Sequence, residues 1–523
     1  MTPRGVRARY PRSIAIAALA FAPWMAGAQA LAPIVYTVRA PQPATHVVQV
    51  EATVPTARRD SVDLMMAVWS PGYYRLEHYE SRVRAFAAHA PDGSALRVMQ
   101  PAPNRWRIYP AGRAQVVIAY EVLSQERSVT LNWVDDTLAV LNGAPTYITL
   151  AEQAHRPHEV HLELAGLWKQ SATSLAPAPD GVPNHYVARD YDELVDSPII
   201  AGTLRLREFT VGGARHVLAS AGDMGAFDDE RAARDLAAIV ETQRQFWGEL
   251  PYQRYVFLNL FRRGGGGLEH RNSTLLTSSA ARVSTPAGYL GWLDFVSHEY
   301  FHAMNVKRLR PVELGPFDYE HPPNTTSLWI SEGLTSYFGE LLVQRSGLAT
   351  TAAALGTLSM HIAHVQNAPG RLVQTLDQSS LDVWSGGVSG IGRDSTTTVS
   401  YYEKGPVVGF LLDARIRRLT NGRRSLDDVM RLAYKRHSGD RGFSAAEFQK
   451  AAEDVAGTSL ATFFRQALAS TDELDYAEAL EWFGLRFMTA DPRLPGRWAL
   501  QVIPDATPVQ RAHLSSWMTE RQP

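Results

Sequence analysis

The sequence predicts a multidomain α+β protein with a β-rich N-terminal sandwich or saddle domain, an α/β middle domain and a C-terminal helical segment. The 523 residues are enough for three or four domains at roughly 150 residues each. Apolar residues change from short alternating runs to helical spacing near residue 225, and helical patterns dominate after residue 400. Hydrophobic residues make up 45% and charged residues 20%, which excludes a largely disordered chain.

Charge and cysteine content exclude several classes of function. Lys and Arg total 52 and Asp and Glu total 53, so the formal net charge of -1 gives no support for nucleic-acid binding. Cysteine is absent, which excludes disulfides, thiol nucleophiles and thiolate metal sites. Any bound metal must therefore be held by His, Asp or Glu.

Residues 1–30 have the features of a secretory signal peptide. An arginine-rich lead precedes the apolar stretch Ile14–Met25, and small-x-small cleavage sequences end at Ala28 and Ala30. The stretch is short for a membrane span, although an uncleaved anchor is the alternative. We therefore expect a periplasmic or secreted protein, cleaved near Ala28 or Ala30, without stable membrane insertion afterwards.

Residues 31–205 are expected to form the β-rich domain. Alternating or β-branched runs recur at short intervals, separated by turn signals such as Pro71-Gly72 and Asp180-Gly181. The expected strands are His46–Val54, Leu64–Trp69, Gln115–Val122, Val129–Trp133, Tyr147–Leu150 and Val160–Leu164.

Residues 206–415 show a mixed pattern that predicts the α/β domain. Helical spacing covers Asp228–Leu250, Leu290–Val306 and Ser327–Arg345, and strands are expected at Tyr255–Phe261 and Ser273–Ser278. Residues 416–470 are expected to be helical and residues 471–523 to form a short mixed tail. The expected elements near the C-terminus are helices at Pro406–Leu419, after Ser425, after Ser444 and at Ser459–Ala469, and strands at Gly484–Met488 and Trp498–Val502.

The most specific motif is His298-Glu299-Tyr300-Phe301-His302. Residues four apart share one face of a helix, so both imidazoles can reach one ion, and Glu299 beside them is a candidate general base. The flanking apolar residues predict the helix that this geometry requires. A helix that carries two surface or core histidines by chance is the alternative.

A third metal ligand is expected at Glu332, 30 residues beyond His302. Large apolar residues flank this glutamate, which is unusual unless a partner offsets its charge. Catalytic zinc keeps three protein ligands and one open position. We therefore predict one zinc ion held by His298, His302 and Glu332.

A glycine-rich loop precedes a second acidic residue. In Gly264–His270 the glycines, including Gly266 and Gly267, allow the backbone to approach a ligand closely. Glu269 is then placed to meet a cation such as a free α-amino group. A flexible hairpin with an exposed acid is the alternative.

A phenol in Tyr401-Tyr402-Glu403-Lys404-Gly405 can donate to a developing oxyanion, with an ordinary interfacial tyrosine as the alternative. Asp294 and Asn305 are candidates to orient the two imidazoles. His361 and His364 are interpreted as ordinary helix residues, because no matching acid is evident near them in the sequence. The basic run from Lys307 is interpreted as solvated or structural, although it could meet a substrate carboxylate.

Together these motifs resemble the gluzincin metallopeptidases, and most closely their glycyl aminopeptidase family, a relative of the aminopeptidase N group. The strings that carry the resemblance are Gly267–His270, His298–His302 with Asn305–Pro311, Trp329–Gly333, Tyr402–Gly405 and, in the N-terminal part, Trp69–Tyr74.

The resemblance implies a thermolysin-like zinc peptidase domain over residues 206–415. His298, His302 and Glu332 correspond to the zinc ligands, and Glu299 corresponds to the general base.

Glu269 stands where the aminopeptidase N group keeps the acid that binds the substrate amine, although His270 replaces its usual neighbour, an asparagine. Tyr402 stands where that group keeps its transition-state tyrosine, with the adjacent Tyr401 as the alternative. Family members often carry a C-terminal PDZ module. Residues 471–523 are too few for a whole one, so we expect a truncated or absent module.

The leading hypothesis is a zinc-dependent aminopeptidase that acts on peptides with a free N-terminus. The resemblance implies a preference for small N-terminal residues, Gly or Ala, and a substrate site that includes Gly266, Gly267 and Glu269. One alternative is a zinc endopeptidase in which Glu269 is structural. The other is a catalytically idle peptide-binding protein, which the intact Glu299 argues against.

Overall fold

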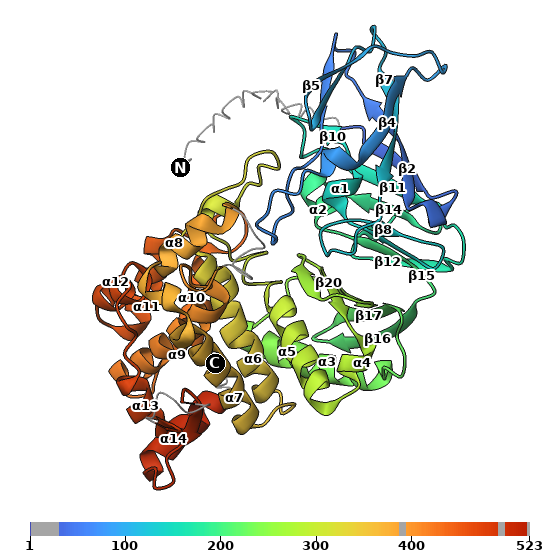
Figure 1. Cartoon of the computed structure of the whole chain (residues 1–523). Helices are drawn as coiled ribbons and strands as arrows, with labels where there is room; N and C mark the ends of the chain where they lie inside the picture. The colour runs from blue at the N-terminus through green and yellow to red at the C-terminus, as the bar shows by residue number, and fades with distance from the viewer. Residues whose placement is uncertain (2–30, 386–393, 490–496, 520–523) are drawn as a thin grey trace.

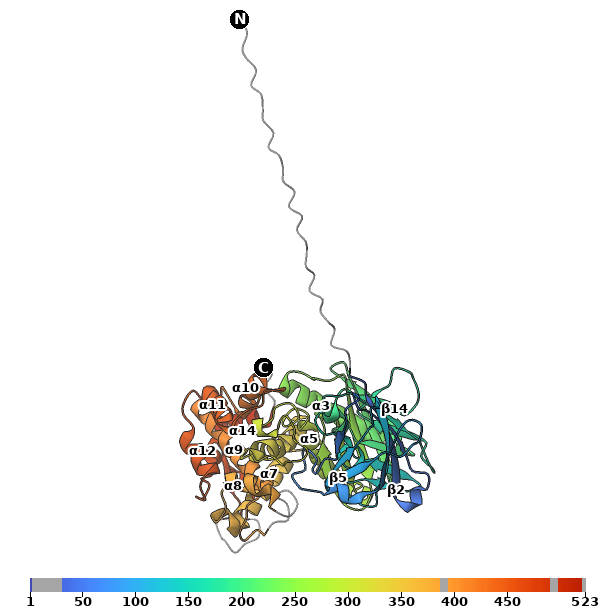
Figure 2. The same cartoon turned by 90° about the horizontal axis from the view of Figure 1, so that it is seen from above.

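The computed structural model describes Met1 and residues 31–385, 394–489 and 497–519. Three parts are visible in Figure 1: a β-rich part at the upper right, an α/β part below it and a helical part at the left. Seen from above, the β-rich part and helices α8–α14 lie at opposite ends (Figure 2). The predicted fold class is thereby confirmed. The expected signal peptide lies outside the described residues, and within them no helix has the length and apolar character needed to cross a membrane.

Three antiparallel or mixed sheets form the β-rich part. The largest has the order β13-β14-β11-β1-β2-β7-β4, and four-stranded sheets have the orders β10-β3-β6-β5 and β12-β15-β9-β8. The strands are β1 (Ile34–Arg39), β2 (Val47–Pro55), β3 (Val62–Met65), β4 (Val83–His89), β5 (Val98–Ala102), β6 (Arg105–Ile108), β7 (Gln115–Leu123), β8 (Trp133–Val134), β9 (Leu138–Leu141), β10 (Thr149–Leu150), β11 (His158–Leu162), β12 (Gln170–Thr173), β13 (Ala176–Pro177), β14 (His185–Ala188) and β15 (Ile199–Gly202). Two short helices, α1 (Gly143–Thr146) and α2 (Tyr191–Val195), accompany them.

Alternating burial along β7 shows why these segments form strands, since every second side chain enters the core. The strand expected at Val129–Trp133 is wrong for all but its last residue. There the side chain of Asn132 accepts a hydrogen bond from the backbone of Asn142, and Asn142 donates to the carbonyl of Leu131. These side-chain bonds take the place of a ladder with a neighbouring strand.

The α/β part is a five-stranded sheet of order β16-β17-β18-β20-β19. Its elements are β16 (Arg205–Val211), β17 (Ala214–Gly222), α3 (Asp229–Trp247), β18 (Arg254–Phe261), β19 (Gly266–Glu269), β20 (Ser273–Ser278), α4 (Ala280–Val283) and α5 (Pro286–Phe301). Strand β19 pairs antiparallel with β20 at the sheet edge. Helix α5 begins four residues before the predicted start because Thr285 caps it and Pro286 occupies its first turn.

The helical part begins with the π-helical turn η4 (Trp329–Leu334), which runs directly into α6. It contains α6 (Thr335–Arg345), α7 (Thr351–Asn367), α8 (Leu376–Leu381), α9 (Tyr401–Leu419), α10 (Leu426–His437), α11 (Ala445–Ala456), α12 (Ala461–Leu468), α13 (Ala477–Phe483), β21 (Leu485–Phe487), β22 (Leu500–Val502) and α14 (Pro508–Met518). Trp517 of α14 lies in the same apolar core as α9 and donates a hydrogen bond to the hydroxyl of Tyr337, 2.8 Å away. The tail is therefore packed into the helical part.

Helix α9 and turn η4 cross with their backbones in contact. A Cβ added to Gly405 would lie 2.5 Å from the Cα of Gly333, and one added to Gly333 would lie 2.6 Å from the Cα of Gly405. Both positions thus require glycine. This close crossing fixes the turn that carries Glu332.

The crossing predicts a stability effect. Gly405→Ala should lower the free energy of unfolding by about 1–3 kcal/mol, because the added methyl group forces the backbones of α9 and η4 apart. Gly356→Ala is the matched control: at this exposed position of α7 the added Cβ meets nothing within 4 Å, so the substitution should raise the free energy of unfolding by about 0.5–1 kcal/mol. Thermal unfolding followed by circular dichroism measures both, and equal melting temperatures for the two variants would contradict the account.

Candidate metal centre

Two helical segments bring together the three predicted metal ligands. His298 and His302 lie one turn apart at the end of α5, and Glu332 comes from η4. The Nε2 atoms of the histidines are 3.0 Å apart, and Glu332 Oε2 lies 3.2 Å from that of His302 and 3.8 Å from that of His298. Glu332 and His302 are each 1% exposed.

Hydrogen bonds on the far side of each ring orient the histidines. His302 donates from Nδ1 to the backbone carbonyl of Asn305, 2.9 Å away, and Nδ1 of His298 lies 3.3 Å from the hydroxyl of Ser336. Both Nε2 atoms are thereby directed toward Glu332. Asn305 was predicted as an orienting residue and acts through its backbone. Ser336, which no sequence pattern indicated, has the orienting role that was predicted for Asp294.

The side chain of Asn305 joins the two halves of the centre. Its Nδ2 donates to the carbonyl of Ile330 at 2.8 Å and to the hydroxyl of Thr335 at 2.9 Å. The loop after His302 is thus tied to the turn that carries Glu332.

The donor set fits a divalent cation. Glu332 Oε1, Glu299 Oε2 and Glu269 Oε1 are buried without a hydrogen-bond partner among the described residues. Burial alone would lower the pKa of His302, but the carboxylates of Glu332, Glu269 and Glu299 raise it to about 10. The negative charges of these three carboxylates therefore favour a positive charge between the two imidazoles. Two imidazoles and one carboxylate are a common ligand set for zinc.

Glu299 lies on the same helix, against strand β19. A Cβ at Gly267 would overlap with the Glu299 carboxylate, so the glycine leaves the room that this side chain occupies. Burial raises the pKa of Glu299 well above its usual value, with the charge of His302 opposing and that of Glu269 adding to the shift. At Gly266 the φ of +126° is one that favours glycine.

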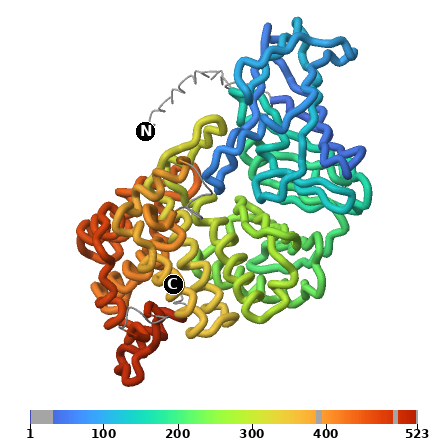
Figure 3. The backbone as a smooth tube through the Cα atoms, viewed as in Figure 1, coloured from blue at the N-terminus to red at the C-terminus, as the bar shows by residue number. Residues whose placement is uncertain are grey.

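Glu269 is buried, being 4% exposed, so the alternative of an exposed acid on a flexible hairpin is wrong. The N-terminal domain covers it: a Cβ at Gly72 would overlap with the Glu269 carboxylate. Figure 3 shows the blue segment that reaches from that domain to the junction of the three parts. Tyr74 on the same segment has a pKa raised well above its usual value, first by burial and then by the charges of Glu332 and Glu269.

A second ionic group lies near Glu269, and its Lys307 partly offsets the charge of that carboxylate. Lys307 Nζ lies 2.9 Å from Asp196 Oδ1, and His270 Nδ1 lies 3.2 Å from the same oxygen. Arg308 of the same basic run is buried and donates to the backbone carbonyls of Arg271 and Ala303. The basic run is therefore structural and not solvated. Asp196 lies far away in the sequence and no motif marked it, and the Trp69–Tyr74 string that contains Tyr74 gave no indication of this contact.

Tyr402 faces the centre and Tyr401 faces the core. The rings of Tyr402 and His298 have centroids 6.3 Å apart, and burial followed by the charge of Glu332 raises the pKa of Tyr402 well above its usual value. Tyr401 is fully buried in the apolar core of the helical part. The preference for Tyr402 thus agrees with the geometry.

The interpretation of His361 and His364 needs correction, because acids do lie beside them. His361 is 2.9 Å from Glu340 of α6 and 2.7 Å from Glu403 of α9, and His364 is 3.1 Å from Glu403. Burial would lower the pKa of His361, but the two glutamates raise it to about 10. His361 therefore links three helices next to Tyr402.

Comparison with known proteins adds two family matches. Residues 35–203 match the Peptidase M61 N-terminal domain, and residues 291–408 match M61 glycyl aminopeptidase. No curated protein matches the sequence. The first matched segment contains Gly72 and Asp196, and the second contains His298, Glu332 and Tyr402.

Solved structures are similar over most of the chain. An aminopeptidase N family protein from Idiomarina loihiensis has 29% identity and a TM-score of 0.80, over 86% of this chain and 78% of that one. A mutant M1 zinc metallopeptidase from Deinococcus radiodurans, bound to a Tyr-Ser-Ala substrate, has 14% identity and a TM-score of 0.52, over 85% of this chain and 95% of that one. The second likeness concerns the fold alone.

The hydrogen bonds of the Asn305 side chain predict an effect on metal affinity. Asn305→Ala should weaken zinc binding about 10–100-fold, because the turn that carries Glu332 loses its connection to His302. Competition with a chromophoric chelator measures the affinity. Asn324→Ala, on an exposed side chain nearby, is the control and should bind zinc as the parent chain does. An unchanged zinc affinity in Asn305→Ala would show that the hydrogen bonds of this side chain do not position the ligands.

Proposed function

We propose that the chain, which belongs to the M61 glycyl aminopeptidase family, is a zinc-dependent aminopeptidase that removes small N-terminal residues, Gly or Ala, from peptides. Membership of this family makes the chain a peptidase. The observation that carries the finer proposal is that Glu269, a third buried acid, lies beside the cluster of His298, His302, Glu332 and Glu299. Peptides with a free N-terminus are the proposed substrates, in line with the peptide bound by the M1 neighbour.

His298, His302 and Glu332 would hold one zinc ion. Bound there, zinc would polarise the substrate carbonyl and would lower the pKa of a water molecule to about 7. Glu299 takes a proton from the attacking water and delivers it to the leaving nitrogen. Its burial suits this role, because a carboxylate with a raised pKa accepts a proton readily.

Glu269 binds the N-terminal ammonium of the substrate and thereby selects which peptide bond is cut. Its unpaired Oε1 faces no hydrogen-bond donor among the described residues, so an ammonium would supply one. Gly266 and Gly267 leave the start of the same strand, β19, without side chains. Tyr402 donates a hydrogen bond to the oxyanion that forms at the cleaved carbonyl.

Two alternatives lead to different outcomes in solution. A zinc endopeptidase would use the same ligands but would leave Glu269 with a structural role beside Lys307. A catalytically idle peptide-binding protein would cleave nothing. We further propose export to the periplasm or the exterior, on the basis of the expected signal peptide alone.

Activity on blocked and free substrates separates these possibilities. The purified chain should hydrolyse Gly- and Ala-p-nitroanilide, should leave the N-acetylated copies intact, and should lose activity to a chelator and regain it with zinc. Glu299→Gln should lower kcat about 10²–10⁴-fold, because it removes the general base. Cleavage of the acetylated copies would establish the endopeptidase, and metal-loaded chain without any cleavage would support the idle binding protein.

The oxyanion role separates the two adjacent tyrosines. Tyr402→Phe should lower kcat about 10²–10³-fold with little change in KM, because the lost hydrogen bond forms only as charge develops. Tyr401→Phe is the matched control and should reduce kcat far less, since Tyr401 lies in the apolar core. Steady-state kinetics on Ala-p-nitroanilide measures both. A larger loss in Tyr401→Phe would reverse the assignment.

A further inference from the structure

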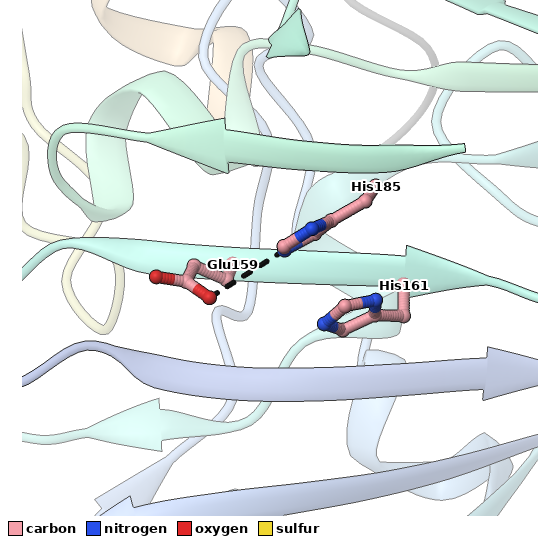
Figure 4. A group of neighbouring side chains, drawn as sticks. All are labelled: Glu159, His161 and His185. Carbon is pink, nitrogen blue, oxygen red and sulfur yellow. Dashed lines mark ion pairs between the residues drawn. The ribbon is translucent and has the colours of Figure 1, made fainter. Parts of the chain in front are cut away.

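A second group of metal-binding side chains lies on the seven-stranded sheet of the N-terminal domain. Glu159 and His161 flank the buried Val160 on β11, so both project from the opposite face of the sheet. His185 on β14 is the residue directly across from His161. Figure 4 shows the three side chains gathered on the two neighbouring strands.

The three side chains are close enough to share an ion. The rings of His161 and His185 are stacked with centroids 3.7 Å apart, and His185 Nε2 lies 3.5 Å from Glu159 Oε2. One possible ligand atom from each residue lies within 4.8 Å of the others. Two zinc–nitrogen bonds at a tetrahedral angle place their nitrogens about 3.4 Å apart, which is close to the spacing of the two rings. To share an ion the rings must turn out of their stacked arrangement so that one nitrogen of each points at the same place.

His185 is oriented as a metal ligand would be. Its Nδ1 lies 2.7 Å from Asp180 Oδ2, and this contact turns Nε2 toward Glu159. The residue is only 6% exposed, yet Nε2 makes no hydrogen bond with the described residues. A cation between Nε2 and the Glu159 carboxylate would give both atoms a partner.

We propose that Glu159, His161 and His185 form a second divalent-metal site, of the zinc type, separate from the catalytic centre. Two imidazoles and a carboxylate select zinc over calcium or magnesium, which prefer all-oxygen sites. The side chain of Glu159 is 32% exposed, so an ion can enter from solvent, and water would complete the coordination. Because the ligands come from β11 and β14, the ion joins two strands and has a structural role.

Metal content measured by mass spectrometry on the dialysed, zinc-loaded full chain tests this site. The parent chain should hold two zinc ions per chain, and His161→Gln should hold one. His302→Gln should also hold one, and the double variant none. His161 is part-exposed, so its replacement should leave the fold intact, which circular dichroism checks.

Two controls match the substitutions. His155→Gln and Glu163→Gln alter exposed residues of the same domain and should keep two ions, whereas Glu159→Gln should lose one. One ion in both the parent chain and His161→Gln would overturn the second site and would leave His185 with its contacts to Asp180 and Glu159 alone. One ion in the parent and none in His161→Gln would instead overturn zinc binding by the catalytic centre and retain the second site.

Discussion

Three carboxylates, those of Glu269, Glu299 and Glu332, are buried around one point, and the site depends on how their charges are offset. Burying such charges without partners costs several kcal/mol per ion. The chain supplies Lys307, which Asp196 already partly neutralises, and His302, whose pKa the carboxylates raise to about 10 against the effect of burial. A divalent cation between the imidazoles and Glu332 would offset the remaining charge and leave both histidines neutral. The need to offset these charges is therefore the same feature that favours a bound cation at this site.

The N-terminal domain is part of this arrangement. The backbone at Gly72 lies against the Glu269 carboxylate, and Asp196 holds both Lys307 and His270. The β-rich domain thereby covers the acid proposed to bind the substrate amine. Residues of this domain therefore complete the surroundings of the proposed substrate site, and they lie within the segment that matches the Peptidase M61 N-terminal domain.

Local patterns in the sequence were sufficient to select the three proposed ligands, which the fold brings together, but they were insufficient to find the residues that orient them. The spacing of His298 and His302 follows from the helical period, and the apolar neighbours of Glu332 marked it as buried. The contacts of Ser336, Asp196 and Tyr74 depend on segments that only the tertiary fold brings together. His361 shows the same limit, because its partners Glu340 and Glu403 are 21 and 42 residues away in the sequence. The π-helical turn depends on the crossing with α9, which helical periodicity does not encode.

The most direct measurement is anomalous diffraction at the zinc absorption edge from crystals of the zinc-loaded chain. We expect an anomalous peak about 2.0–2.2 Å from Nε2 of His298, Nε2 of His302 and a carboxylate oxygen of Glu332. A zinc-loaded crystal without a peak at these three side chains, while they keep the arrangement described above, would contradict it.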